Sequence, residues 1–462
     1  MEDICGRLAD WAIDSSWKTL AAPAQVRIRE LLIDTLACAF GGRPHPAVAQ
    51  AAKVASNLTS SQSKDRDATG LGSGRRLSTM GAILDNGAAI RALDLNDFYW
   101  GPGLGGHPSD VFASAIAIAE EADSSIDECL AAAAVGYEFF TRLMDLMRAG
   151  DPPWAWDHTS ACGPAAALIA GRLLKLDRET LAQALAISIA RAPVFSGFRA
   201  GKISSAKAAA PAMAQMDGLL AVQLAMAGMT GPREVMAGPR GLEAIIVEGS
   251  DINHLIPKPD DPHRVLDITV KRFPCMGTGQ ATTATAVELH RKLAGRISDI
   301  AGILLHVSDS GIVRRQTADV YRRPDRRETA DHSFYAIFGI ALVDGHLEPS
   351  QFAARRWEDA DVASVIDKLQ LSPDLPGEAE GIFPARAHVT MKDGSTLDVD
   401  MPYAPGHRLN PLSEEQMCDK FRTFATPAIG ASRVDGILKT CLDRSGKTTI
   451  RDLMKFCAES IS

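Results

Sequence analysis

Small and apolar residues recur at helical spacing through the first half of this chain, and this pattern limits the fold more than any other feature. Alanine and leucine return every three or four positions, with little of the period-two alternation that is typical of strands. Small side chains on a helix face let two helix axes approach closely, which is typical of a helical core. The pattern predicts helices at residues 26–40, 111–121, 126–146, 164–174, 180–191 and 215–227.

The pattern changes near residue 265, where period-two alternation begins. Strands are expected at residues 265–270, 303–307, 387–391 and 396–401, with Asp393-Gly394 as a hairpin turn between the last two, and helices at 280–293 and 330–344. Ser413 is expected to cap a further helix.

The fold class predicted from these patterns is mainly α, with a large all-helical domain and a smaller inserted α+β domain. Residues 1–265 would form the first part of the helical domain and residues 266–406 the α+β domain. Residues 407–462 would be a C-terminal helical segment that returns to the helical domain.

Charge and composition exclude several classes of protein. The chain has 462 residues, 46% of them hydrophobic, and a net charge of −8 without a basic run, so nucleic acid is not expected as a partner. Its uncharged runs are shorter than the roughly 20 residues of a membrane-spanning helix. The N-terminus has no basic region before an apolar stretch, which favours a cytoplasmic protein. Eight cysteines without a C-x-x-C pair argue against a disulfide scaffold or a zinc ribbon.

Residues 94–110 are the most polar stretch of the helical part and the first candidate site. They include carboxylates, a glycine-rich segment and His107, which stands before a proline and is therefore expected in an extended or turn conformation. Ser109 or Asp110 is expected to cap the next helix. The stretch is equally compatible with a long surface loop.

Three further stretches are weaker candidates. Lys202 and Lys207 lie near Arg199 in a run of small residues, which suggests an anion pocket or lysines that reach water. Residues 270–277 place Lys271 and other polar groups at the expected domain junction, where ligand sites are common. His158 stands four residues before a cysteine, but no third ligand is suggested nearby, so no metal is expected. Glycines 101–106 lack the preceding strand of a dinucleotide site, so no nucleotide cofactor is expected.

Short motifs recur along the chain in a specific order. They are R-A-L-D-L-N-D at 91–97, G-H-P-S-D at 106–110, H-T at 158–159, K-R-F-P-C at 271–275, D-H-S-F at 331–334 and N-P-L-S at 410–413. In this order they resemble the MmgE/PrpD family, which includes 2-methylcitrate dehydratases, cis-aconitate decarboxylases and an iminodisuccinate epimerase. The resemblance implies two domains, a homodimer, no metal or cofactor, and an active site between the domains.

The resemblance also implies the site residues. The catalytic residues carried over from the family motifs are Asp94, His107, His158, Lys207 and Lys271. The family reactions act at a carbon next to a carboxylate and pass through or near a carbanion, which lysines would stabilise. We expect His107 and Asp94 to form the proton-transfer pair, His158 to be the complementary acid, and Lys207 and Lys271 to anchor substrate carboxylates.

This chain also departs from the family pattern. Phe98 stands where threonine is common and Gln280 stands where histidine is frequent; with Trp100 and Arg272 they are the expected substrate contacts.

The function predicted is a cofactor-independent, 2-methylcitrate dehydratase-like lyase that removes a proton next to a carboxylate of a di- or tricarboxylic acid. The alternatives are an epimerase, a cis-aconitate-type decarboxylase, and a non-catalytic homodimer that binds a carboxylate.

Overall fold

The computed structural model describes residues 3–59, 68–147, 156–199, 204–237, 240–246, 248–377 and 381–457. The chain divides into two compact units. Unit 1 comprises Met1–Ala92, Asn96–Ile268 and Ser413–Ser462, and unit 2 comprises Leu93–Leu95 and Thr269–Leu412. The fold is mainly α, as predicted.

The regular secondary structure in the described part of unit 1 is mainly helical. They are α1 (Ile4–Asp14), α2 (Ala22–Gly42), α3 (Pro46–Asn57), α4 (Thr79–Arg91), α5 (Phe112–Glu121), α6 (Ile126–Leu146), α7 (Cys162–Leu173), α8 (Arg178–Arg191), α9 (Ala210–Met226), α16 (Glu414–Ile429), α17 (Ala431–Cys441) and α18 (Ile450–Cys457). The six helices predicted in the first half are confirmed. Two short antiparallel pairs accompany them, β1 (Ala68–Thr69) with β2 (Arg76–Leu77) and β3 (Tyr99–Trp100) with β4 (Gly105–Gly106). None of the described helices is long and apolar enough to cross a membrane.

The small residues predicted to let helices approach do so between α7 and α9. A Cβ atom added to Gly218 on α9 would lie 2.0 Å from the carbonyl oxygen of Gly163 on α7. The two backbones are therefore in direct contact, and only glycine fits at this crossing. The same holds between α2 and α4, where a Cβ atom on Gly42 would lie 2.1 Å from the carbonyl oxygen of Ala89.

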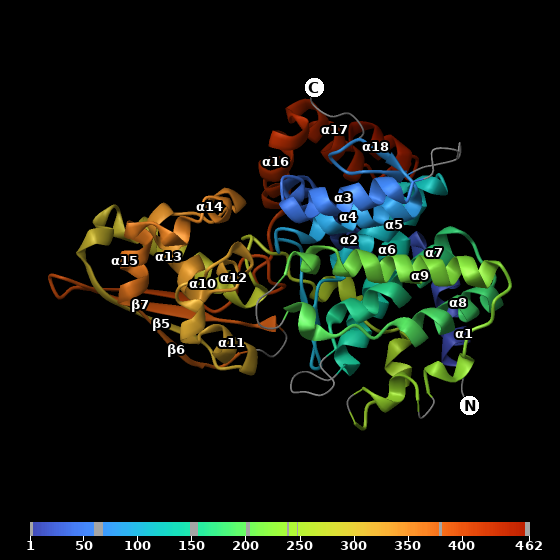
Figure 1. Cartoon of the computed structure of the whole chain (residues 1–462), viewed down its shortest axis with the longest axis horizontal. Coiled ribbons are helices and arrows are strands. Elements are labelled where there is room, and N and C mark those ends of the chain that lie inside the picture. The colour runs from blue at the N-terminus through green and yellow to red at the C-terminus, as the bar shows by residue number, and fades with distance from the viewer. Residues whose placement is uncertain are drawn as a thin grey trace. The chain divides into compact units, whose positions relative to one another are not determined.

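The last part of the chain packs on the first part of unit 1. Figure 1 shows α16, α17 and α18, in red, beside the blue helices of the N-terminal part, and α16 lies along α2. Ser413 caps α16 as predicted, since its side chain accepts a hydrogen bond from the backbone N–H of Gln416. Within the α2–α16 contact, Lys420 forms an ion pair with Asp34, and both side chains are fully buried.

Unit 2 contains a four-stranded sheet of order β6-β5-β7-β8. Its strands are β5 (Ile300–Ser308), β6 (Leu369–Leu375), β7 (Ala385–Met391) and β8 (Thr396–Met401); β5 runs parallel to β6 and antiparallel to β7. Its helices are α10 (Gln280–Leu293), α11 (Gly311–Gln316), α12 (Arg327–Ala330), α13 (Phe334–Asp344), α14 (Pro349–Ala353) and α15 (Ala360–Lys368). Figure 1 shows α10, α13 and α15 on the same side of the sheet. The strands predicted around 303–307, 387–391 and 396–401 are confirmed.

One local prediction in this part of the chain was wrong, and a second was wrong only in where the helix starts. The strand expected at 265–270 is a 3₁₀ turn, Arg264–Asp267, followed by irregular backbone. Val265, Ile268 and Val270 are buried, whereas Leu266 is exposed. The backbone N–H of Val270 donates a hydrogen bond to the carbonyl oxygen of Gly406, but the segment forms no strand. The helix expected at 330–344 begins at Phe334, because the hydroxyl of Ser333 accepts a hydrogen bond from Ala336 and caps α13 there. Asp331 and His332 consequently lie in a turn between α12 and α13.

Candidate active site

Lys271 and Asp94 form a buried ion pair in unit 2. The side chain of Lys271 has no exposed surface, and its Nζ donates to Asp94 Oδ1 and to the Asp94 carbonyl oxygen, both at 2.9 Å. Asp94 has a φ of 51°, a left-handed conformation that is uncommon for residues other than glycine. In this conformation its carbonyl and its carboxylate both face one ammonium group. Strained backbone of this kind is concentrated at functional sites.

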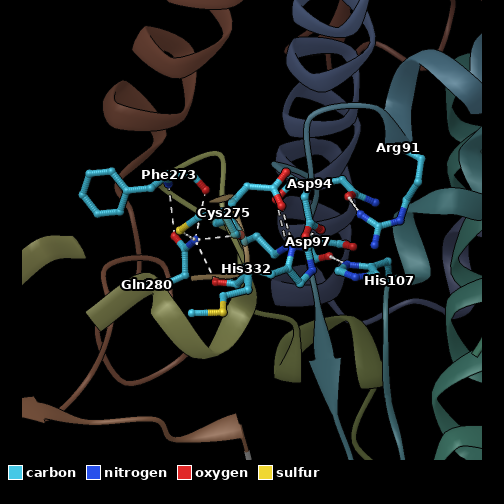
Figure 2. Close-up of polar contacts among 12 residues, drawn as sticks. Arg91, Asp94, Asp97, His107, Phe273, Cys275, Gln280 and His332 are labelled. Carbon is cyan, nitrogen blue, oxygen red and sulfur yellow. Dashed lines mark hydrogen bonds and ion pairs between the residues drawn. The ribbon is translucent and has the colours of Figure 1, made fainter. Parts of the chain in front are cut away.

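His332 joins this ion pair from the turn before α13. Its Nε2 lies 3.2 Å from Asp94 Oδ2, and its Nδ1 forms a hydrogen bond with Oδ1 of Asp331. Figure 2 shows His332 directed toward Asp94. His332 belongs to the D-H-S-F motif, but the sequence alone assigns it no role. The available signal was a histidine between an acid and a helix-capping serine, which places its ring at a defined turn.

Gln280, the first residue of α10, holds the backbone that follows Lys271. Its Oε1 accepts hydrogen bonds from the backbone N–H groups of Arg272 and Phe273, and its Nε2 donates to the carbonyl oxygens of Phe273 and Cys275 (Figure 2). The side chain is fully buried. These hydrogen bonds explain why the side-chain amide of Gln280 is buried. The amide fixes the backbone that follows Lys271.

Replacing Gln280 by alanine should destabilise the protein. The substitution leaves four buried or partly buried backbone groups without their side-chain partner. Each unsatisfied group costs about 1–3 kcal/mol when water cannot replace the bond. We expect the free energy of unfolding to fall by about 3 kcal/mol in urea titrations, because water entry will satisfy part of the set. Gln351→Ala, at an amide in the same unit that contacts fewer backbone groups, is the matched comparison. An unchanged unfolding midpoint for Gln280→Ala would contradict this role.

His107 and His158 lie together in unit 1. Their ring centroids are 5.1 Å apart in an edge-to-face arrangement. His107 Nδ1 lies 2.7 Å from the carbonyl oxygen of Asp97 (Figure 2). A carbonyl only accepts, so Nδ1 carries the proton, and Nε2 is the basic nitrogen of the neutral ring. His158 is buried, with its Nε2 3.9 Å from a carboxylate oxygen of Asp110 and its Nδ1 3.7 Å from one of Asp157.

Asp97 fixes the loop that carries His107. Its Oδ1 accepts from the backbone N–H of Ser109 at 3.0 Å and its Oδ2 from the hydroxyl of Tyr137 at 2.7 Å. Burial raises the pKa of Asp97 to about 6, although the hydrogen bonds from Ser109 and Tyr137 act in the opposite direction. A carboxyl group with a pKa near the working pH is typical of acid–base sites.

The expected cap at Ser109 or Asp110 was wrong. His107 is the residue before the 3₁₀ turn Pro108–Val111, and Ser109 and Asp110 lie inside this turn. Both face the side-chain amide of Asn96, whose Nδ2 lies 3.1 Å from Ser109 Oγ and from Asp110 Oδ1. The polar side chains are therefore used to hold the loop closed rather than to begin the helix.

The structure also places the other predicted residues. Lys207 is buried in the 3₁₀ turn Ser205–Ala208 of unit 1, and Lys202 lies outside the described residues. Phe98 is 5% exposed. Trp100 packs over Gly105 of its own hairpin, since a Cβ atom there would meet the indole at 2.3 Å. Arg272 is exposed. The pairing of His107 with Asp94 joins residues of the two units and stays a prediction, as do the assigned roles of all these residues.

Most of the amino-acid sequence matches family models of known proteins. The MmgE/PrpD N-terminal domain model matches residues 6–255, and the MmgE/PrpD C-terminal domain model matches residues 273–444. The chain belongs to the MmgE/PrpD family. The resemblance inferred from the short motifs is therefore confirmed, and it extends over both units.

Several relatives within the MmgE/PrpD family have known names. The chain is 27% identical over 435 residues to a cis-aconitate decarboxylase of Mus musculus, which covers 89% of this chain and 84% of that protein. It is 27% identical over 436 residues to the Homo sapiens cis-aconitate decarboxylase, covering 89% and 86%. A cis-aconitate decarboxylase of Aspergillus terreus is 24% identical over 486 residues, covering 98% and 95%. These relatives support an enzyme of the dehydratase or decarboxylase type.

Proposed function

We propose that this protein is a lyase that removes carbon dioxide or water from a small di- or tricarboxylic acid through a carbanion. The observation that carries the proposal is the fully buried ammonium group of Lys271 beside the carboxylate of Asp94 and the imidazole of His332. A buried cation is costly unless it is paired, and it is most useful where negative charge develops. A carbanion next to a carboxylate is such a charge.

The residue types supply the steps of both reactions. In dehydration, Asp94 takes the C–H proton, the electron pair stays on carbon, and the C–O bond then breaks as hydroxide leaves with a proton from an acid. In decarboxylation, the C–C bond to the carboxylate breaks, carbon dioxide leaves, and the carbanion takes a proton. Lys271 and Lys207 stabilise the carboxylates and the developing charge in either case. We assign proton exchange to His107 and the complementary acid to His158.

Decarboxylation is the first reaction to test, because the named relatives are cis-aconitate decarboxylases. Dehydration is the second candidate, since the L-D-x-N-D and H-P-S-D motifs favour the dehydratase members of the family.

The buried ring of Phe98 is expected to influence which acid is accepted as substrate. It removes the hydroxyl group of the threonine that is common at this position, which favours an acid with an alkyl group over a more polar one. The homodimer and the cytoplasmic location are part of the same proposal.

The proposal can be tested by proton NMR of the purified protein in deuterated water. The panel should contain cis-aconitate, citrate, 2-methylcitrate and hydroxy dicarboxylates. Decarboxylation would release carbon dioxide and leave deuterium on the protonated carbon, whereas dehydration would give a new alkene signal without gas. Epimerisation would exchange the C–H proton and leave the carbon skeleton intact. We expect one of the first two results.

Two variants distinguish the activity of this protein from that of contaminating enzymes in the preparation. His107→Ala should lower turnover about 100-fold or more, the usual contribution of a positioned acid–base group. His346→Ala removes an exposed histidine and should leave turnover unchanged. Folded protein that turns over no acid of the panel would contradict the proposal. If it still bound a panel acid, the non-catalytic carboxylate-binding alternative would be supported instead.

A further inference from the structure

Four side chains of unit 2 form a row of alternating charge, in the order Asp331, His332, Asp94 and Lys271. Lys271 and both carboxylates are buried, whereas His332 keeps 18% of its side-chain surface exposed. His332 is therefore the most exposed member of the row, and it lies directly between the two carboxylates.

Each ring nitrogen of His332 faces a carboxylate oxygen. Nδ1 is hydrogen-bonded to Asp331, and Nε2 lies 3.2 Å from Oδ2 of Asp94. An ionised carboxylate only accepts hydrogen bonds, so both neighbours are satisfied when both ring nitrogens carry a proton. The imidazolium form also balances the row, because two cations then face two carboxylates. Removal from water is costly for a charge that lacks such a partner.

We propose that His332 is a positioning residue that holds the carboxylate of Asp94 in one orientation for proton transfer, and that Asp331 orients its ring. Lys271 binds Oδ1 of Asp94 and His332 faces Oδ2, so the two side chains together fix both carboxylate oxygens. Capping of α13 by Ser333 fixes the backbone next to the imidazole. The inference rests on the proposed role of Asp94 as the base.

Substitutions in the full-length protein test this role in the reaction. His332→Leu should lower kcat about 100-fold, as expected when a reacting group is misplaced, with KM changed by less than about threefold. His332→Gln should recover most of the lost kcat, because the amide N–H₂ can donate to Asp94 as Nε2 does. His388→Gln is the matched control. His388 forms an exposed pair with Asp398 at 2.8 Å in the same unit, and its replacement should change neither constant.

A measurement without substrate tests the arrangement independently of activity. In ¹⁵N NMR of histidine-labelled protein at neutral pH, we expect both ring nitrogens of His332 to be protonated; the loss of its signals in His332→Gln identifies them. An unprotonated Nε2, or equal kcat loss in His332→Leu and His332→Gln, would overturn the positioning role. Wild-type protein that shows the imidazolium signals but turns over no acid would support the arrangement and refute only the proposed function.

Discussion

Replacing Lys271 by methionine should lower kcat/KM about 1000-fold, the upper range for loss of one group that stabilises charge in a transition state. Methionine is similar in length but carries no charge. The ammonium group has no exposed surface, so water cannot replace it beside Asp94. The measurement is steady-state kinetics on whichever acid the NMR panel identifies. The control variant Lys292→Met removes an exposed lysine from the last turn of α10 and should leave the rate unchanged.

The same substitution should also destabilise the fold, and this effect has to be separated from the catalytic one. Removing one partner of a buried ion pair costs about 3–5 kcal/mol when the other charge is left uncompensated. Because His332 still faces Asp94 Oδ2 at 3.2 Å in this variant, we expect a loss at the lower end of that range. The double variant Asp94→Asn/Lys271→Met removes both charges, so it should recover most of the lost stability while it stays inactive. If the double variant regained activity together with stability, Lys271 would be a structural residue and its proposed role in the reaction would be wrong.

Helix periodicity was a reliable guide to unit 1 for a physical reason. A helix satisfies its own backbone, so its residues need only one apolar face, and that face is visible in the sequence. A strand needs a partner strand, and residues 265–270 do not form one. They form a 3₁₀ turn and irregular backbone, and most of their apolar side chains are buried there. The hydroxyl of Ser333 decided the start of α13, a local bond that apolar periodicity does not record.

The candidate site was predictable in its residue types but not in its contacts. The motifs brought Asp94, His107, His158 and Lys271 to attention, and the structure places two of them, Lys271 and Asp94, in one ion pair of unit 2. The contact of Asp94 with His332 spans more than two hundred residues of chain, so no local pattern could reveal it. The positive φ of Asp94 is likewise set by tertiary contacts and is not a property of its motif.

Lys420 links the C-terminal segment to helix α2 within unit 1, and its replacement by methionine should be among the most destabilising single substitutions in the chain. Its ion pair with Asp34 links α16 to α2, and neither side chain is exposed. Beside it, Phe421 packs edge-on against Phe40 with ring centroids 5.9 Å apart. Water cannot enter to solvate Asp34 once the ammonium is removed. We expect the free energy of unfolding to fall by about 3–5 kcal/mol in urea titrations followed by circular dichroism.

Arg422, two residues along α16, provides the comparison. It forms an exposed pair with Asp419, so Arg422→Met should change the free energy of unfolding by no more than about 1 kcal/mol. Asp34→Asn/Lys420→Met should be more stable than Lys420→Met alone, because no ionised carboxylate is then left without its cation. Equal losses for Lys420→Met and Arg422→Met would show that burial gives the Lys420 pair no special weight. In that case the apolar contact between Phe40 and Phe421 would be the main link between α2 and α16.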